Sequence, residues 1–232
     1  DPQVRELLLK GSFGLERESL RVTQDGYLAQ TPHPFPGDEH IVRDFSENQV
    51  EVNTPVVDSP AQAVAVLEHY DDVIQKKLAE QGELLWPFSN PPYIRSAIDV
   101  PVAQFEGADA HKTAYREYLD ERYGRYKMTF SGIHFNYSFA DELLKADFAA
   151  SGEEDFDAYK DRLYLDLAER CVAYGWLMTA ITAASPLMDS SFVEKKKVGG
   201  DLFMGFASPR SSELGYWNFF TPVLDYTSIE GY

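Results

Sequence analysis

One stretch organises the chain: Asp44-Phe45-Ser46-Glu47-Asn48-Gln49-Val50-Glu51-Val52-Asn53-Thr54-Pro55. It alternates like a β-strand, yet it carries acidic side chains where a strand normally carries apolar ones. Side chains two apart on an extended chain share a face of the sheet, so one face holds Glu47, Gln49, Glu51 and Asn53. Asp44 is out of phase with them and would join that face only at a bulge or a strand start. The pattern predicts a strand over residues 41–54 with an acidic face.

A second acidic stretch lies earlier in the chain, at Gly14-Leu15-Glu16-Arg17-Glu18. Its two glutamates are two residues apart, so within a strand predicted over residues 12–22 they point to the same face. The two stretches are near neighbours in sequence, and Asp25-Gly26 between them is typical of a hairpin turn. Antiparallel packing of both strands in one sheet is therefore expected. It would bring together as many as five acids: Glu16, Glu18, Asp44, Glu47 and Glu51.

Two interpretations of this acidic face stay open. A cluster of carboxylates cannot remain ionised and dry without a cation. Hard divalent cations prefer oxygen ligands, and Mg²⁺ is the natural occupant if a phosphate also binds. Acidic residues on strands are, however, usually a solvated outer face, and this chain is acidic throughout.

Composition narrows the possible partners. With 232 residues, 44% of them apolar, the chain can bury a sizeable core as one large domain or two small ones. The net charge of −17 argues against nucleic acid and anionic membrane, and an anionic nucleotide would need metal ions as a bridge. The one cysteine, Cys171, is expected to be a buried helix residue. A chain with no disulfide framework suits a reducing compartment, so we expect the cytoplasm.

Apolar periodicity and helix start and stop signals predict the remaining elements. A helix should begin at the N-cap Ser59 and end at Gly82. The others are a helix over 3–10 closed by Gly11, a strand and rigid loop over 84–93, a helix over 108–123, a long central strand over 126–139 and a helix over 154–183. The last helix carries an apolar stripe that predicts core packing: Phe156, Tyr159, Leu163, Leu167, Cys171 and Tyr174.

A carboxylate-rich sheet face with Mg²⁺, together with scattered Arg and Lys, fits metal-assisted phosphoryl transfer from a nucleotide. Such transfer needs no covalent nucleophile, and the sequence contains no nucleophile elbow and no P-loop. His134 lies beside Asn136 on the polar face of the predicted central strand. It is either a hydrogen-bonded structural residue or a contact for phosphate or substrate. The run Lys195-Lys196-Lys197 before Gly199-Gly200 is either a surface loop or a lid whose lysines, such as Lys196, contact phosphate.

Motifs in order along nearly the whole chain resemble the glutamate–cysteine ligase family, most closely the ligase half of bifunctional glutathione synthetases. They are GLERESLRV (14–22), DFSENQVE (44–51), LWPFSNPP (85–92), YREYL (115–119), SGIHFNYS (131–138) and RSSELGY (210–216). The resemblance implies an α+β fold like that of glutamine synthetase, with a curved, mainly antiparallel sheet and helices packed outside. It also implies that ATP phosphorylates the γ-carboxylate of L-glutamate and that the amine of L-cysteine attacks the acyl phosphate.

The resemblance assigns roles to individual residues. The ligands of Mg²⁺ or Mn²⁺ would be Glu16, Glu18, Asp44 and Glu51. Glu16 would also contribute to nucleotide binding. Glu47 matches a neighbouring acid of the family. The substrate pocket would be formed by Phe45, Tyr115, Leu119 and Tyr216. Arg210 would contact substrate carboxylate or phosphate. His134 and Asn136 match the active-site strand.

Two departures from the family pattern are visible. Met128 stands where related enzymes often have Gln, so a polar substrate contact is missing. The family also needs a later strand with a Glu and an Arg, and the bifunctional type adds an ATP-grasp domain that joins glycine. Residues 1–232 are therefore expected to be the N-terminal portion of one ligase domain. A homodimer, a ligase for a different amine, and a non-catalytic metal- or nucleotide-binding module remain alternatives.

Overall fold

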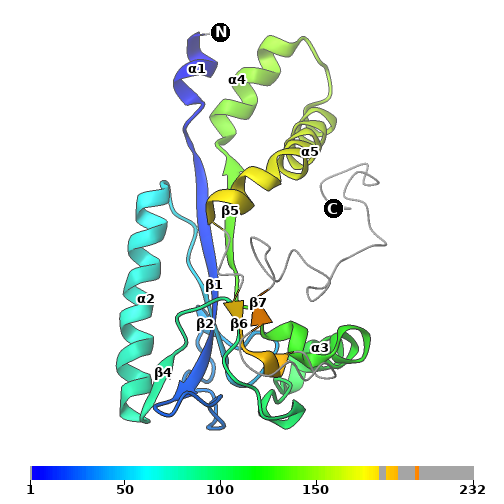
Figure 1. Cartoon of the computed structure of the whole chain (residues 1–232). Helices are drawn as coiled ribbons and strands as arrows, with labels where there is room; N and C mark the ends of the chain where they lie inside the picture. Colours follow the sequence, from blue (N-terminus) through cyan, green and yellow to red (C-terminus); the bar gives the residue numbers. More distant parts are fainter. Residues whose placement is uncertain (1, 183–186, 193–201, 204–232) are drawn as a thin grey trace. The chain divides into compact units, whose positions relative to one another are not determined.

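The computed structural model describes residues 2–182, 187–192 and 202–203 (Figure 1). These residues divide into two compact units. The larger unit contains the described part of 14–136 and 184–216, and the smaller unit contains that of 1–13 and 137–183. Each unit is described by itself.

An antiparallel sheet forms the centre of the larger unit. Its strand order is β2 (Ile41–Val42), β3 (Gln49–Asn53), β1 (Gly11–Thr23) and β4 (Glu83–Leu85), and β5 (Ile133–Phe139) also pairs with β1. The predicted pairing of the two acidic stretches is confirmed, because β1 and β3 are antiparallel with Glu18 opposite Glu51. A short pair, β6 (Leu187–Met188) with β7 (Leu202–Phe203), forms a separate sheet.

The strand predicted over 41–54 is broken in two, and this corrects the sequence interpretation. A turn occupies the middle of the stretch, where the backbone N–H of Gln49 donates to the carbonyl of Ser46. The side-chain amide oxygen of Gln49 accepts in return from the Ser46 backbone N–H at 3.1 Å. Asn48 donates to the carbonyl of Asp99 at 2.6 Å. These buried amides supply hydrogen bonds that a continuous ladder would otherwise provide.

One helix covers the apolar side of the sheet. It is α2 (Pro60–Glu80), with Ser59 as N-cap accepting a hydrogen bond from the backbone of Gln62, as predicted. Ile74 and Leu78 of this helix are buried against Val52 and its neighbours in the sheet. Gly82 follows the helix at φ +70°, a conformation that favours glycine.

The long strand predicted over 126–139 is also wrong in its first half. Helix α3 (Ala110–Tyr123) ends at Gly124, and residues Arg125–Thr129 then form a 3₁₀ helix. The carbonyl of Met128 is held by the side-chain amide of Gln49 at 3.1 Å. Met128 therefore belongs to a buried apolar cluster rather than to a strand face. The alternation of residue types was produced by core packing of a turn, not by an extended backbone.

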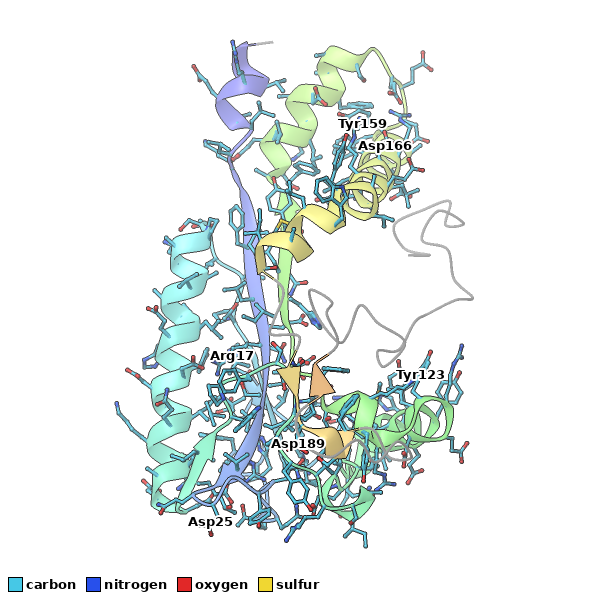
Figure 2. All side chains as sticks on the ribbon, viewed as in Figure 1. Arg17, Asp25, Tyr123, Tyr159, Asp166 and Asp189 are labelled. Atoms are coloured by element: carbon cyan, nitrogen blue, oxygen red, sulfur yellow. The ribbon has the colours of Figure 1, made fainter. Side chains whose placement is uncertain are left out.

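The smaller unit contains α1 (Pro2–Leu7), α4 (Asp141–Ser151) and α5 (Phe156–Thr182). The helix predicted over 3–10 ends before Gly11, which belongs to β1. Tyr159 of α5, labelled in Figure 2, is buried. Its ring centre lies 5.4 Å from that of Phe148 in α4. Farther along the stripe Leu167 is half-buried, and Cys171 and Tyr174 are exposed. The prediction that Cys171 is buried is wrong, because α4 is much shorter than α5 and covers only its beginning.

Candidate active site

Paired strands place the predicted acids on one face of the larger sheet. Glu18 of β1 lies opposite Glu51 of β3, and Glu16 lies opposite Asn53. Burial, together with the negative charges of Asp44, Glu18 and Glu16, raises the pKa of Glu51 to about 7. Burial also raises the pKa of Asp44, while the charge of Arg116 opposes that shift. The acids therefore repel one another in a partly dry environment, which a solvated outer face would not produce.

Strand β5 and the residue before it hold two of these acids. The Nδ1 atom of His134 lies 3.0 Å from Glu16, and the side-chain amide of Asn136 donates to the same carboxylate at 2.9 Å. The hydrogen bond from His134 is the main reason that the pKa of Glu16 is lowered. Glu18 accepts a hydrogen bond from the backbone N–H of Gly132 at 2.9 Å. His134 and Asn136 thus lie beside Glu16, and their part in a reaction stays a prediction.

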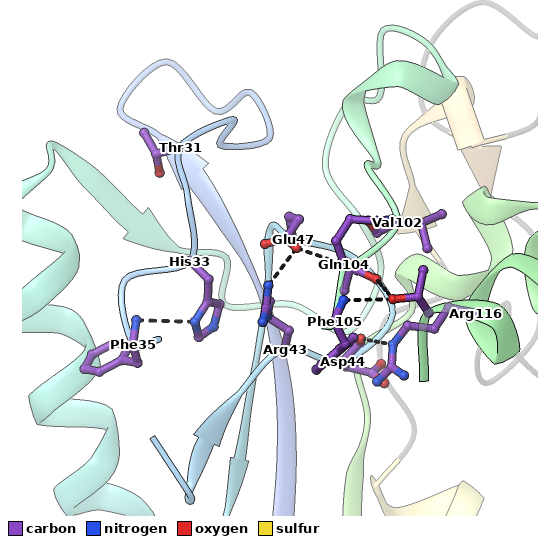
Figure 3. A network of polar contacts seen from close by, with 12 residues as sticks. Thr31, His33, Phe35, Arg43, Asp44, Glu47, Val102, Gln104, Phe105 and Arg116 are labelled. Carbon is purple, nitrogen blue, oxygen red and sulfur yellow. Dashed lines mark hydrogen bonds and ion pairs between the residues drawn. The ribbon is translucent and has the colours of Figure 1, made fainter. Parts of the chain in front are cut away.

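Glu47 does not join the acidic face. Its carboxylate accepts hydrogen bonds from Arg43 and from the backbone N–H of Gln104, both at 2.9 Å (Figure 3). The residue sits in the turn between β2 and β3 rather than in a strand. The predicted common face of Glu47 with Gln49 and Glu51 therefore fails, because the turn changes the direction of its side chain.

The remaining acids have the chemistry that a hard divalent cation requires. Their carboxylate oxygens are the preferred ligands of Mg²⁺, and the raised pKa of Glu51 reflects burial and then the negative charge of its neighbours, both of which a bound cation would offset. Among the described residues, no three His, Cys, Asp or Glu side chains are yet grouped closely enough to hold a metal ion. Glu16 and Glu18 instead face hydrogen-bond donors of β5 and its preceding residue. The donor set fits such an ion in chemical type, without a preassembled coordination geometry.

A cavity of about 480 Å³, the acidic-face cavity, opens beside these acids. It brings together predicted substrate-pocket residues from the β2–β3 turn and from α3, namely Phe45, Tyr115 and Leu119. Its lining also includes Glu18, Asp44, Met128, Ser131 and His134. Three of the predicted site residues lie outside the described part of the chain, namely Lys196, Arg210 and Tyr216.

Arg116 is a residue of this site to which the sequence interpretation assigned no role. Its Nε–H donates to the backbone carbonyl of Asp44, and its guanidinium carbon lies 4.7 Å from the ring centre of Phe105 (Figure 3). Arg43 contacts the same ring at 4.6 Å. Burial lowers the pKa of Arg116, and the charges of Asp44 and Glu51 oppose that shift. The only sequence signal for this role was its position next to Tyr115 in a recognised motif.

The architecture and the site define the class of protein: an α+β domain with a mainly antiparallel sheet and a carboxylate-rich face beside a cavity. The model of the family described as glutamate-cysteine ligase matches residues 1–232. The chain belongs to the glutamate–cysteine ligase family.

Relatives extend this assignment. The chain is 38% identical over 244 residues to the glutathione biosynthesis bifunctional protein GshAB of Listeria monocytogenes, covering 100% of this chain and 32% of that protein. A bifunctional glutathione synthetase from Pasteurella multocida superposes with a TM-score of 0.84 at 32% identity, covering 100% of this chain and 30% of that one. A glutamate–cysteine ligase from Francisella tularensis in complex with AMP gives a TM-score of 0.78 at 28% identity, covering 89% and 43%. The chain spans about a third of the length of the curated bifunctional relatives it matches.

Proposed function

We propose that the protein is an ATP-dependent ligase that forms γ-glutamylcysteine, the first step of glutathione synthesis. The γ-carboxylate of L-glutamate attacks the γ-phosphorus of ATP, ADP leaves, and the amine of L-cysteine then displaces phosphate from the acyl phosphate and loses a proton. The observation that carries this proposal is the acidic face of β1 and β3 beside a cavity lined by Phe45, Tyr115 and Leu119. Membership of the family supports the choice of substrates.

Glu16, Glu18, Asp44 and Glu51 would hold Mg²⁺ or Mn²⁺. When bound, the ion neutralises phosphate charge, which a chain of net charge −17 would otherwise repel. His134 and Asn136 orient the Glu16 carboxylate through their hydrogen bonds. His134 also lines the cavity, where its imidazole is available to a phosphate or acyl phosphate oxygen.

The amine substrate would occupy the acidic-face cavity against Phe45, Tyr115 and Leu119, with Tyr216 completing the pocket. Arg210 would contact substrate carboxylate or phosphate, and Lys196 would contact the nucleotide. Residues 1–232 would form the N-terminal portion of one ligase domain. The 32% coverage of a bifunctional relative supports a longer protein with an ATP-grasp domain. A homodimer is also part of the proposal.

We place this enzyme in the cytoplasm, where a chain with one cysteine needs no disulfide. None of the helices in the described residues has the length and apolar character needed to cross a membrane.

A second candidate is a ligase that joins glutamate to a different amine. Met128 favours it, because this residue lines the cavity where related enzymes often have Gln. Replacing cysteine by other amines in the same assay would separate the two candidates by their kcat/KM values.

The test is ADP release from Mg-ATP by the whole protein, with glutamate alone and then with cysteine added. Cysteine-dependent ADP release together with γ-glutamylcysteine in the product is the expected result. If the protein binds Mg-ATP but releases no ADP with any amine tested, it is a non-catalytic nucleotide-binding module and not a ligase. Glu51→Gln serves as the inactive control, and Glu121→Gln, an exposed acid of α3, as the matched active control.

A further inference from the structure

Ser131 has a buried hydroxyl without a hydrogen-bond partner in the described part of the chain. The residue lies between the 3₁₀ helix and β5, and only 6% of its surface is exposed. Its backbone N–H donates to the carbonyl of Ser89 at 2.9 Å, which fixes the backbone. The side-chain Oγ is buried without a hydrogen-bond partner among the described residues. A buried hydroxyl left unpaired is destabilising, so this position favours a hydrogen-bonding group that arrives from outside the chain.

Ser131 lies in the wall shared by two cavities. Ser131 lines the acidic-face cavity and also a neighbouring cavity of about 760 Å³. Along the edge of β1, Trp86 donates its backbone N–H to Leu20, and Glu18 donates to Gly132. Ser19 lies between these two contacts, at a gap between β4 and the start of β5. Ser89, Ser131 and Gly132 border this gap from both cavities, so the side chain is next to space that a ligand can fill.

The apolar part of the acidic-face cavity indicates which ligand group Ser131 meets. Phe45, Leu119, Met128 and Phe130 form that part of the lining. The carbonyl oxygen of Met128 already accepts a hydrogen bond from the side-chain amide of Gln49. Charged groups of a substrate would instead bind near the charged residues of the acidic face. A neutral hydroxyl at an apolar wall suits a small, weakly polar group such as a thiol.

We propose that Ser131 is a specificity-determining residue that hydrogen-bonds the thiol of the amine substrate. This inference rests on the proposed ligase function and deepens it. The hydroxyl pairs with the thiol in the bound state, so an analogue with a methyl group in place of the thiol leaves the hydroxyl buried and unpaired. A site built in this way discriminates against the analogue more strongly than apolar packing alone does.

The experiment compares cysteine with 2-aminobutyrate, whose methyl group replaces the thiol, in the whole protein. Ser131→Ala should raise the KM for cysteine about tenfold, as expected for the loss of one hydrogen bond, and leave the KM for 2-aminobutyrate unchanged. Its unfolding temperature should not fall, because the hydroxyl loses no hydrogen bond to any residue that the structure describes. Ser96→Ala, an exposed serine whose side chain caps no helix, is the control and should match the wild type in every measurement.

An equal rise in both KM values would overturn the proposal, since Ser131 would then act only through packing. Unchanged KM values for both amines would also overturn it, because water would then satisfy the hydroxyl. A wild-type protein without cysteine-dependent ADP release would reject the proposed function itself, and this inference with it. The first two outcomes leave the ligase assignment standing.

Discussion

Arg17 of β1, labelled in Figure 2, and Asp71 of α2 form a bidentate ion pair. Arg17 lies between Glu16 and Glu18 in the sequence of the strand. Both side chains are mostly buried, with 19% and 22% of their surface exposed. Successive residues of a strand point to opposite faces, so Arg17 ties the middle of the acidic motif to the helix behind the sheet. The pair therefore keeps the two glutamates in register from the far side.

Asp71→Asn should lower the free energy of unfolding by about 1–3 kcal/mol, because it leaves the guanidinium of Arg17 without its charged partner. Urea unfolding followed by circular dichroism measures this loss. Glu80→Gln breaks the exposed pair with Lys77 on the same helix and should cost less than about 0.5 kcal/mol. Equal effects of the two variants would contradict a structural role for the Arg17–Asp71 pair.

Glu51→Gln should stabilise the metal-free fold while abolishing Mg²⁺-dependent ADP release. The pKa of Glu51 in the fold, about 7, lies above its ordinary value. The folded state therefore binds more protons than the unfolded state between these two values, and stability falls as pH rises through this window. At pH 8 in EDTA the variant should gain about 1–2 kcal/mol, a figure reduced for partial exposure, and at pH 4 it should gain little. A variant that is less stable than wild type at pH 8 would show that the acids do not repel one another.

His33 should make the protein sensitive to mild acid. Its side chain is buried, and burial with the charges of Arg21 and Arg43 lowers its pKa to about 4. The unfolded histidine binds a proton near pH 6.5, so the unfolded state gains protons first and stability falls as pH drops from about 6.5 to about 4. The loss attributable to this residue should reach at most about 3 kcal/mol.

Urea unfolding at pH 7 and at pH 4.5 measures the effect of His33. His33→Asn should lose the part of the acid sensitivity that this imidazole causes, and its amide oxygen can still accept from the backbone of Phe35 (Figure 3). The exposed His111, changed to Asn, should retain the full sensitivity. Retention of the sensitivity in His33→Asn would assign it to other groups.

Arg116→Lys should weaken cysteine binding without removing the charge near Asp44. Lysine cannot reproduce the guanidinium that donates to the Asp44 carbonyl and stacks on Phe105. Because Phe45 follows Asp44 and lines the cavity, we expect the KM for cysteine to rise about tenfold, the value of one lost hydrogen bond. Arg122→Lys, an exposed arginine on the same helix, should leave the KM unchanged. An unchanged KM in Arg116→Lys would limit its role to the stability of the fold.

Local signals were reliable wherever one short segment decides its own conformation. Ser59 and Pro60 start α2 because their backbone and side-chain properties act within one turn of helix. The alternation around Glu16 and Glu18, with that around Glu51, correctly predicted which faces meet when β1 and β3 pair. The same alternation misled over residues 126–132, where buried side chains of a 3₁₀ turn imitate a strand.

By itself, then, the sequence determined the two acidic strands, their shared face, the caps of the helices and the family. Only the tertiary structure decided that Glu47 turns toward Arg43 and that Arg116 supports Asp44. It also decided that the buried Ser131 hydroxyl has no partner among the described residues, and that Cys171 is exposed. The physical reason is range: capping and strand alternation act over a few residues, whereas each of these outcomes depends on which distant segments pack together or leave a side chain uncovered.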